Sequence, residues 1–271
     1  MSFSTIDSLN HLIQSDSSFR SRKQIELFTA LGFRWNRSKV PHKLTIHSIE
    51  RVNFRFHRML PEFVWEASVL EGNPFTFTEV KTLLDGVTFG GRKLSDQEQV
   101  LNLAITSQHL LALVKTNQFS LDKNTFTELN GLVARNTALG WGHFRGEGNV
   151  TDETKVTPYV DLGKHGRYTS KTTEMRALEL NRIFSIGLDA LQFHVQHPFE
   201  KAVAFFLFGS LHKFFFNGNK CTSRLMMNGI LMSAGIDALS IPADKVALFN
   251  EKMIQFYLKK DATEMMEFLI N

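Results

Sequence analysis

The chain has 271 residues, of which 43% are hydrophobic and 21% are charged. This composition is typical of a globular protein with a sizeable core, and it excludes disorder, collagen and coiled-coil arrays. The formal net charge is +4, and the basic residues form no tract that would indicate nucleic acid. A lone cysteine, Cys221, favours a reducing compartment. Since no apolar run has the length of an export signal or a membrane span, we expect a cytoplasmic protein without a membrane partner.

The spacing of apolar residues predicts a mostly helical protein. Hydrophobic side chains recur every three or four positions in the long stretches between the six prolines, which is the pattern of amphipathic helices. Ser95 and Glu98 form a capping-box pattern before a long apolar run and predict the start of a long helix. The same periodicity predicts helices over residues 6–14, 23–31, 46–60, 126–135 and 174–193.

Two segments of the second half differ from this amphipathic pattern. Pro198 suits the first turn of a helix, and the residues after it are apolar nearly all round, so we expect a buried helix at the centre of the core. Residues 142–170 contain Gly, Pro, Thr and Val with little helical period, and they predict a β-hairpin or a long loop. Neither a linker-like segment nor a repeat is found, which favours one compact unit with an N-terminal helical extension.

The segment most informative for function is Asn217-Gly-Asn-Lys-Cys-Thr-Ser-Arg224, which directly precedes an apolar helical run. Gly218 allows a tight turn and a close approach of a ligand to the backbone. The free amides at the start of the helix attract an anion, and Lys220 and Arg224 share a helical face beside it. The segment therefore indicates a phosphate-binding site. Taken alone, such an octapeptide is more often an ordinary helix start with two solvated basic residues.

This segment resembles the motif of the Fic family, His-x-Phe-x-Asp/Glu-Gly-Asn-Gly/Lys-Arg-x-x-Arg, in which Phe215, Gly218, Asn219, Lys220 and Arg224 match. Further similarities follow in the family's order, namely SVLEGN, EQVLNLA, GHFR and HPFEKA at residues 68–73, 98–104, 142–145 and 197–202. The resemblance covers roughly residues 68–235. It implies a mainly α-helical, Fic-like bundle with a small β-hairpin flap, and transfer of AMP from ATP, bound with Mg²⁺, to a protein hydroxyl.

The sequence departs from that motif at three positions. Lys213 takes the place of the family's histidine, which acts as the general base, and a lysine with a pKa near 10.4 is expected to hold anions rather than accept protons. His212 is the catalytic candidate only if the loop carries an extra residue, and is otherwise a packed or surface histidine. Asn217 replaces the acidic metal-binding residue and is a weak Mg²⁺ candidate. Cys221 replaces an arginine and is expected to be a small buried residue rather than a reactive thiol.

The resemblance also identifies a candidate inhibitory residue. Glu71-Gly72 matches the end of the family's inhibitory helix, whose glutamate binds the second arginine of the motif and displaces the γ-phosphate. The hydroxyl position of that pattern is Ala67 here, although Ser68 is adjacent. We therefore expect a Glu71–Arg224 ion pair. The composition of residues 71–74 also fits an ordinary helix stop.

The family's flap corresponds to residues 150–168, where an exposed strand would pair with the backbone of a target protein. Gly142 and Arg145 are expected to support the base of that hairpin, with Arg145 bonding loop carbonyls. An exposed Arg145 without a role is the alternative.

These patterns predict three regions, with an N-terminal helical region over residues 1–94, a Fic-like core over 95–240 and a C-terminal helix over 241–271. We expect a nucleotide-binding protein of the AMP-transferase class, which binds ATP with Mg²⁺ and whose activity is weak or lost because the motif is degenerate. The alternative is a non-enzymatic regulatory module that holds a partner protein. The target protein is not indicated, and the sequence leaves open whether the chain forms a homo-oligomer.

Overall fold

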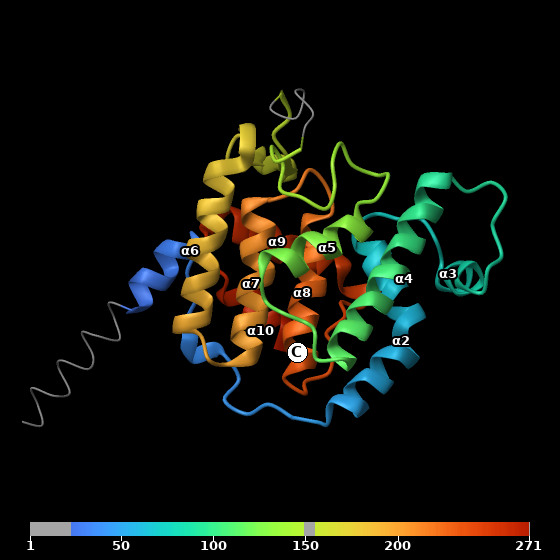
Figure 1. The fold of residues 1–271 in the computed structure, drawn as a ribbon, viewed down its shortest axis with the longest axis horizontal. Helices are drawn as coiled ribbons and strands as arrows, with labels where there is room; N and C mark the ends of the chain where they lie inside the picture. Colours follow the sequence, from blue (N-terminus) through green and yellow to red (C-terminus); the bar gives the residue numbers. More distant parts are fainter. Residues whose placement is uncertain (1–22, 149–154, 271) are drawn as a thin grey trace, which may run out of the picture.

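The computed structural model describes residues 23–148 and 155–270, and most of them are helical, as predicted (Figure 1). The helix predicted over residues 23–31 is present at those residues, and those predicted over 126–135 and 174–193 are present with shifted ends. The helix predicted over residues 6–14 lies outside the described residues. After the helical residues 23–31, the elements in chain order are η1 (Arg37–Lys39), α2 (Ile49–Leu70), α3 (Phe77–Leu84), α4 (Leu94–Lys115), α5 (Lys123–Val133), β1 (Tyr159–Asp161), η3 (Gly163–His165), β2 (Arg167–Thr169), η4 (Met175–Ala177), α6 (Leu178–His194), α7 (Pro198–His212), α8 (Asn219–Ser233), η5 (Ala243–Lys245), α9 (Val246–Lys259) and α10 (Thr263–Ile270).

Helices α7 and α8 pack against each other at the centre of the fold (Figure 1). Most side chains of both helices are buried, which confirms the helix predicted after Pro198 as part of the core. Pro198 occupies the first turn of α7, and His197 caps this helix by accepting a hydrogen bond from the backbone of Glu200. Gly209 of α7 faces Ser223 of α8, where a Cβ would lie 2.1 Å from the serine Oγ. Glycine therefore allows the two helices to approach closely.

A cluster of phenylalanine rings joins the central helices to their neighbours. Phe126 of α5 is fully buried, and its ring centroid lies 4.7–6.3 Å from those of five other rings, which belong to Phe144, Phe184, Phe205, Phe214 and Phe215. Two of these rings belong to the loop between α7 and α8. The cluster thus fixes the position of that loop against the core.

Helix α2 is longer than predicted. It begins at Ile49, where Ser48 caps it by accepting a hydrogen bond from the backbone of Arg51, and it continues past Pro61 to Leu70. The residues beyond Pro61 remain largely buried and the helix packs on α4 and α8, so tertiary packing outweighs the hydrogen bond that a proline removes. The longer helix carries Glu71 to the first turns of α8.

The long helix predicted near residue 95 is present as α4, but Ser95 is not its cap. Helix α4 begins at Leu94 with Lys93 as the N-cap residue, whose side chain makes no capping hydrogen bond. Ser95 therefore lies inside the first turn. A capping box is present at the start of α3 instead, a helix that the sequence analysis does not predict. There, Thr76 and Glu79 satisfy each other's backbone amides.

The predicted hairpin is confirmed within residues 142–170. Strands β1 and β2 pair antiparallel, with Tyr159 opposite Thr169. The C-terminal region, expected as one helix, forms α9 and α10, because Lys260 ends α9 in a left-handed conformation with φ 52°. The region boundaries at residues 94 and 240 stay predictions. Among the described residues, no helix combines the length and apolar character needed to span a membrane.

Candidate functional site

The loop between α7 and α8 is braced by two buried asparagines. Asn219 accepts a hydrogen bond from the amide of Phe215 (2.9 Å) and donates one to the carbonyl of the same residue (2.7 Å). Asn130 of α5 donates to the carbonyl of Asn217 at 3.1 Å. Both braces are shielded from water, so the loop has a defined shape. The side chain of Asn219, predicted to bind phosphate, is thus engaged within the loop.

Helix α8 starts at a glycine with a left-handed backbone. Gly218 has φ 73° and serves as the N-cap residue, and as a glycine it has no side chain that could cap the amides of the first turn. The left-handed conformation favours glycine, and a Cβ at this position would be tight, at 3.0 Å from Val133 and 3.3 Å from Asn130. An uncapped helix N-terminus, with the helix dipole behind it, favours an anion.

Glu71 pairs with the two basic residues of α8. Arg224 Nη2 lies 3.4 Å from Glu71 Oε1, and Lys220 Nζ lies 3.9 Å from Oε2. The predicted Glu71–Arg224 ion pair is therefore present. Arg224 is only 6% exposed, and its Nη1 has no hydrogen-bond partner among the described residues. Because a buried donor without a partner costs about 1–3 kcal/mol, Arg224 retains donor capacity that an anion can satisfy.

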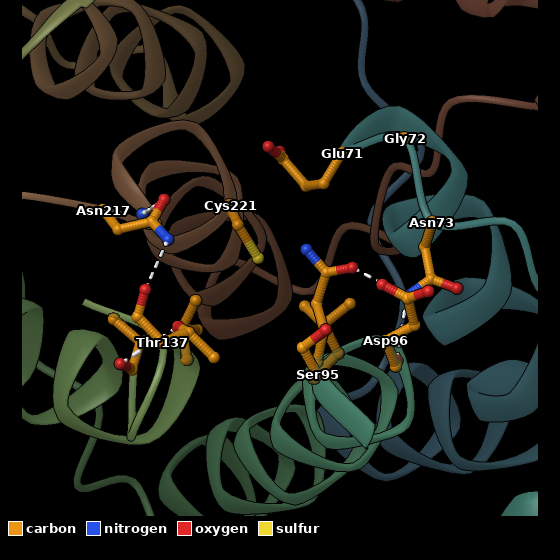
Figure 2. A pocket seen from close by; sticks show the side chains of 13 residues that line it. Glu71, Gly72, Asn73, Ser95, Asp96, Thr137, Asn217 and Cys221 are labelled. Carbon is orange, nitrogen blue, oxygen red and sulfur yellow. Dashed lines mark hydrogen bonds between the residues drawn. The ribbon is translucent and has the colours of Figure 1, made fainter. Parts of the chain in front are cut away.

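A pocket of about 220 Å³ opens beside the start of α8 (Figure 2). Glu71 extends toward it from the end of α2, Asn217 and Cys221 line the α8 side, and Ser95 and Asp96 line the α4 side. The remaining wall combines apolar and polar groups, including Leu103, Val133, Gln99 and Thr137. The volume is smaller than the roughly 300–1,000 Å³ typical of small-molecule pockets. Removal of the Glu71 side chain from the wall would enlarge the pocket.

The end of α2 determines the position of Glu71. Gly72 ends the helix with φ 80°, and the amides of Glu71 and Asn73 both donate to the carbonyl of Ser68 at 3.0 Å. The Asn73 side chain then donates to Gln99 of α4 at 2.7 Å. The segment is thus an ordinary helix stop, as its composition predicts. The same stop also directs the Glu71 carboxylate toward α8.

Lys213 follows α7 in a left-handed conformation with φ 50°. Its N–H donates to the carbonyl of Gly209 (3.1 Å), and its own carbonyl accepts a hydrogen bond from Arg145 Nε (2.7 Å). Burial, assisted by the charge of Lys220, lowers the pKa of the amine from 10.5 to about 8, although Glu71 acts in the opposite direction. The pKa is thus lower than that of an ordinary lysine. That Lys213 holds anions stays a prediction.

His212 lies in the last turn of α7 and faces the helical residues 23–31. Its Nε2 hydrogen-bonds the carbonyl of Leu31 at 2.9 Å, and since a carbonyl only accepts, Nε2 carries the proton. Burial lowers the pKa of His212 to about 4, so the ring is neutral at physiological pH. This geometry gives no support to His212 as a general base.

The remaining two departures from the motif lie at the pocket wall. Cys221 is buried, and burial raises the pKa of its thiol to about 12, which confirms a small buried cysteine over a reactive one. Asn217 Oδ1 accepts a hydrogen bond from the Gly218 amide (2.8 Å), and its Nδ2 donates to Thr137 O (3.3 Å). Within residues 23–148 and 155–270, no group of three or more His, Cys, Asp or Glu residues is arranged to hold a metal ion. Magnesium binding by Asn217 stays a prediction.

Arg145 connects the hairpin to the loop. It is fully buried, and its guanidinium donates to the carbonyls of Lys213 (2.7 Å) and Lys171 (2.6 Å) and to the hydroxyls of Thr173 (2.7 Å) and Ser170 (3.3 Å). Arg145 therefore supports the base of the hairpin through loop carbonyls, as expected, and is not an exposed residue. Burial lowers its pKa to about 10, so it keeps its charge at neutral pH.

Asn130 shapes the site although no sequence motif marks it. Besides bracing the loop, its Oδ1 accepts a hydrogen bond from the amide of Gly142 (3.2 Å), and its Nδ2 donates to Thr222 Oγ1 (3.3 Å). The available signal is positional. Asn130 is a polar residue on the face of α5 that buries Phe126 and Val133, and a buried amide in such a place requires partners.

Comparison with known proteins identifies the fold. No protein-family model matches the sequence. The structure is similar to a Fic family protein from Desulfovibrio desulfuricans G20, with a TM-score of 0.64, 17% identity and coverage of 93% of this chain and 70% of that chain. A Fic-domain-containing signaling protein from Bacteroides thetaiotaomicron VPI-5482 gives a TM-score of 0.64, 17% identity and coverage of 91% and 88%, respectively. For Fic-1 from C. elegans the values are 0.58, 14%, 96% and 72%.

The chain is therefore a helical protein with the Fic fold, a bundle with a small β-hairpin, as the sequence resemblance implies. At identities of 17% or less, this similarity defines the fold and not the activity.

Proposed function

We propose that the protein binds a nucleoside triphosphate at the start of α8, with its phosphates against the helix N-terminus and Arg224. The observation that carries the proposal is the buried Arg224 Nη1, which has no described partner and belongs to a helix with an uncapped N-terminus. Lys220 supplies a second cation in the same first turns. A phosphate group would satisfy all of these donors together. ATP is the ligand that the sequence resemblance implies.

The adjoining pocket favours a nucleotide over a small inorganic anion. Leu103 and Val133 offer apolar surface for a base, whereas Asp96, Gln99 and Thr137 offer polar groups for the hydroxyls of a sugar. Such a mixture of apolar wall and a few polar groups is common in small-molecule sites. The pocket extends from the same helix start that would receive the phosphates.

Glu71 is proposed to restrain this site. Its carboxylate contacts the two cations, Lys220 and Arg224, that the phosphates would use. A phosphate must therefore compete with the carboxylate for the same donors, and the two negative charges repel each other. Affinity for the nucleotide should be low while Glu71 holds its present position.

The proposed reaction class is transfer of AMP to a protein hydroxyl, with an activity that is weak or lost. The neutral His212 is engaged with a backbone carbonyl, and Cys221 adds no charge where the resemblance implies an arginine. The hairpin formed by β1 and β2 is the proposed docking edge for a target protein.

Magnesium fits this site only together with the phosphate oxygens of a ligand. Asn217 offers an amide oxygen that already accepts a hydrogen bond, and the described residues supply no cluster of carboxylates. Mg²⁺ in nucleotide sites commonly keeps several waters and shares the substrate phosphates. Asn217 is the residue that would hold it, and the ion would neutralise phosphate charge.

Thermal unfolding in the presence of ATP and Mg²⁺ tests the proposal. A ligand that binds the folded state at about one hundred times its Kd adds about 2.7 kcal/mol of stability, which corresponds to a rise in Tm of roughly 5–10 °C. We expect a small rise for the wild type, a larger rise for Glu71→Gly and Glu71→Gln, and no rise for Arg224→Ala in the Glu71→Gly background.

Glu62→Gln is the matched control, because Glu62 is an exposed acid on the same helix, α2. Its response to ATP should equal that of the wild type. If neither Glu71 variant responds to ATP, the nucleotide proposal fails and the protein-interaction module becomes the better account. If Glu62→Gln gains as much as Glu71→Gln, general charge and not the ion pair limits binding.

A further inference from the structure

Asn53 is a polar residue on the buried face of α2. It shares this face with Val52, Phe56 and Leu60 and is only 7% exposed. Its Oδ1 is closed to water and bonds to no described residue. Asparagine is also a weak helix former in the interior of a helix, because its amide competes for backbone hydrogen bonds. Neither packing nor helix propensity therefore explains an asparagine at this position.

The other buried asparagines of the described residues show what such an amide normally does. Each of them makes at least one side-chain hydrogen bond to the protein. They are Asn73, Asn102, Asn130, Asn219 and Asn228. A buried amide oxygen without a partner is costly and rare in native proteins, so the exception at Asn53 requires an explanation.

Asn53 lines a pocket of about 400 Å³ between α2 and α4, two helices that lie side by side (Figure 1). Ile49, Phe54 and Leu111 supply its apolar surface, and Phe54 is 62% exposed. The volume lies within the roughly 300–1,000 Å³ typical of small-molecule pockets. The pocket is formed by the first turns of α2 and the last turns of α4, whereas Glu71 lies at the other end of α2. It is therefore separate from the pocket beside α8, with which it shares no lining residue.

The polar groups of this pocket favour a neutral ligand. Glu50 and Lys115 line it with opposite charges, so neither an anion nor a cation is selected by net charge. The buried polar group of the wall is the Asn53 amide, which carries an acceptor oxygen and a donor NH₂ group in one plane. The terminal torsion of asparagine is broad, so an amide without a bonded oxygen can turn either atom to a ligand.

We propose that this pocket binds a neutral, planar molecule with a carboxamide edge and an apolar body, such as an aromatic amide. The ligand N–H donates to Asn53 Oδ1, and the ligand carbonyl accepts a hydrogen bond from Asn53 Nδ2. The apolar body packs on Phe54 and Leu111. A ketone of the same shape lacks the N–H and leaves Oδ1 without a partner. This site is independent of the nucleotide that the proposed function assigns to the start of α8.

An NMR titration of the isotope-labelled full chain with three probes tests the inference. Benzamide carries the carboxamide edge, acetophenone replaces its NH₂ group by a methyl group, and benzoate carries a negative charge instead. Because a hydrogen bond to a buried acceptor and the cost of leaving that acceptor unpaired act together, we expect benzamide to bind roughly tenfold more tightly than either other probe. The signals that shift should be those of residues 49–57 and 111–115.

Asn53→Leu removes the amide and keeps a side chain of similar size. It should weaken benzamide binding roughly tenfold, to the level of acetophenone. It should not lower the Tm, because the group that it removes is buried without a partner for its oxygen.

Asn102→Leu is the matched control. Asn102 of α4 is 6% exposed, but its Nδ2 donates to the carbonyl of Arg135 at 3.0 Å. This variant should lower the Tm and leave the preference for benzamide unchanged. Phe54→Ala is a second variant that should fold normally, because the ring is largely exposed. It should weaken the binding of benzamide and acetophenone by similar factors, since both use the same apolar wall.

The inference is overturned if benzamide and acetophenone bind equally well to the wild type, or if Asn53→Leu keeps the preference for benzamide. Signal shifts confined to residues 217–221, or displacement of benzamide by ATP, would place the probe in the pocket beside α8 and overturn it as well. A loss of Tm in Asn53→Leu as large as that in Asn102→Leu would show that the Asn53 amide already has its partners. None of these results alters the response of Tm to ATP, so the proposed function is tested separately.

Discussion

Replacement of Lys213 by methionine is expected to stabilise the protein at neutral pH. The folded state holds the Lys213 amine at a partly buried position that lowers its pKa from 10.5 to about 8. That interval corresponds to roughly 3 kcal/mol of lost stability while the amine is charged. Residual contact with water reduces this value, so we expect a gain of about 1–2 kcal/mol from a side chain of similar length without a charge.

The dependence on pH gives this prediction its sign. Because the pKa of Lys213 is lower in the folded chain than in the unfolded chain, the unfolded state binds more protons between about pH 8 and 10.5, and wild-type stability rises there. The advantage of Lys213→Met should be full below pH 8 and should shrink toward pH 10. Urea unfolding at pH 7 and pH 10 measures both values. A variant less stable at pH 7, or one with the same advantage at both pH values, would refute the reasoning.

Three further predictions concern the frame that holds the site. Gly209→Ala should destabilise the protein by about 1–3 kcal/mol in urea unfolding, since the new Cβ would lie 2.1 Å from Ser223 Oγ, and Ser223→Ala should restore part of the loss. Phe126→Ala should cost about 3–5 kcal/mol, because its fully buried ring contacts five others, and an unchanged melting curve would contradict this packing. Asp122 caps α5 by accepting a hydrogen bond from the amide of Thr125 (2.8 Å). Burial raises the pKa of Asp122, but the hydrogen bonds that its carboxylate accepts together hold that pKa below the usual range. Asp122→Ala should cost about 1 kcal/mol at pH 7, and the loss should vanish as acid protonates the carboxylate, which unfolding at several acidic pH values can follow.

The sequence predicts best those helices whose apolar residues alone mark them as buried. Helix α7 is apolar nearly all round and starts at Pro198, so both its existence and its first residue follow from composition. Ser95 is a counterexample, because a Ser-x-x-Glu pattern marks a cap only where the serine backbone is extended, and here Ser95 already has helical neighbours. The short helix α3, which has a true capping box at Thr76, carries too little hydrophobic period for detection.

The sequence predicts which residues form the site, but not how deeply they are buried or which way their side chains point. The Glu71–Arg224 ion pair follows from the sequence resemblance and is present at 3.4 Å. The lowered pKa of Lys213 depends on burial, a tertiary property that residue type does not carry. His212 and Lys213 are adjacent, and the side chains of adjacent helical residues point about 100° apart. Only the fold determines that the His212 side chain faces Leu31.

Arg145 connects the hairpin region to the loop between α7 and α8 through one buried guanidinium. The guanidinium bonds the carbonyl of Lys213 on one side, and Lys171 and Thr173, which follow strand β2, on the other. If a partner that displaces the hairpin changes the free energy of anion binding at α8, then by linkage an anion at α8 changes the affinity for that partner by the same factor. Measured coupling between the two would thus report on a single buried cation.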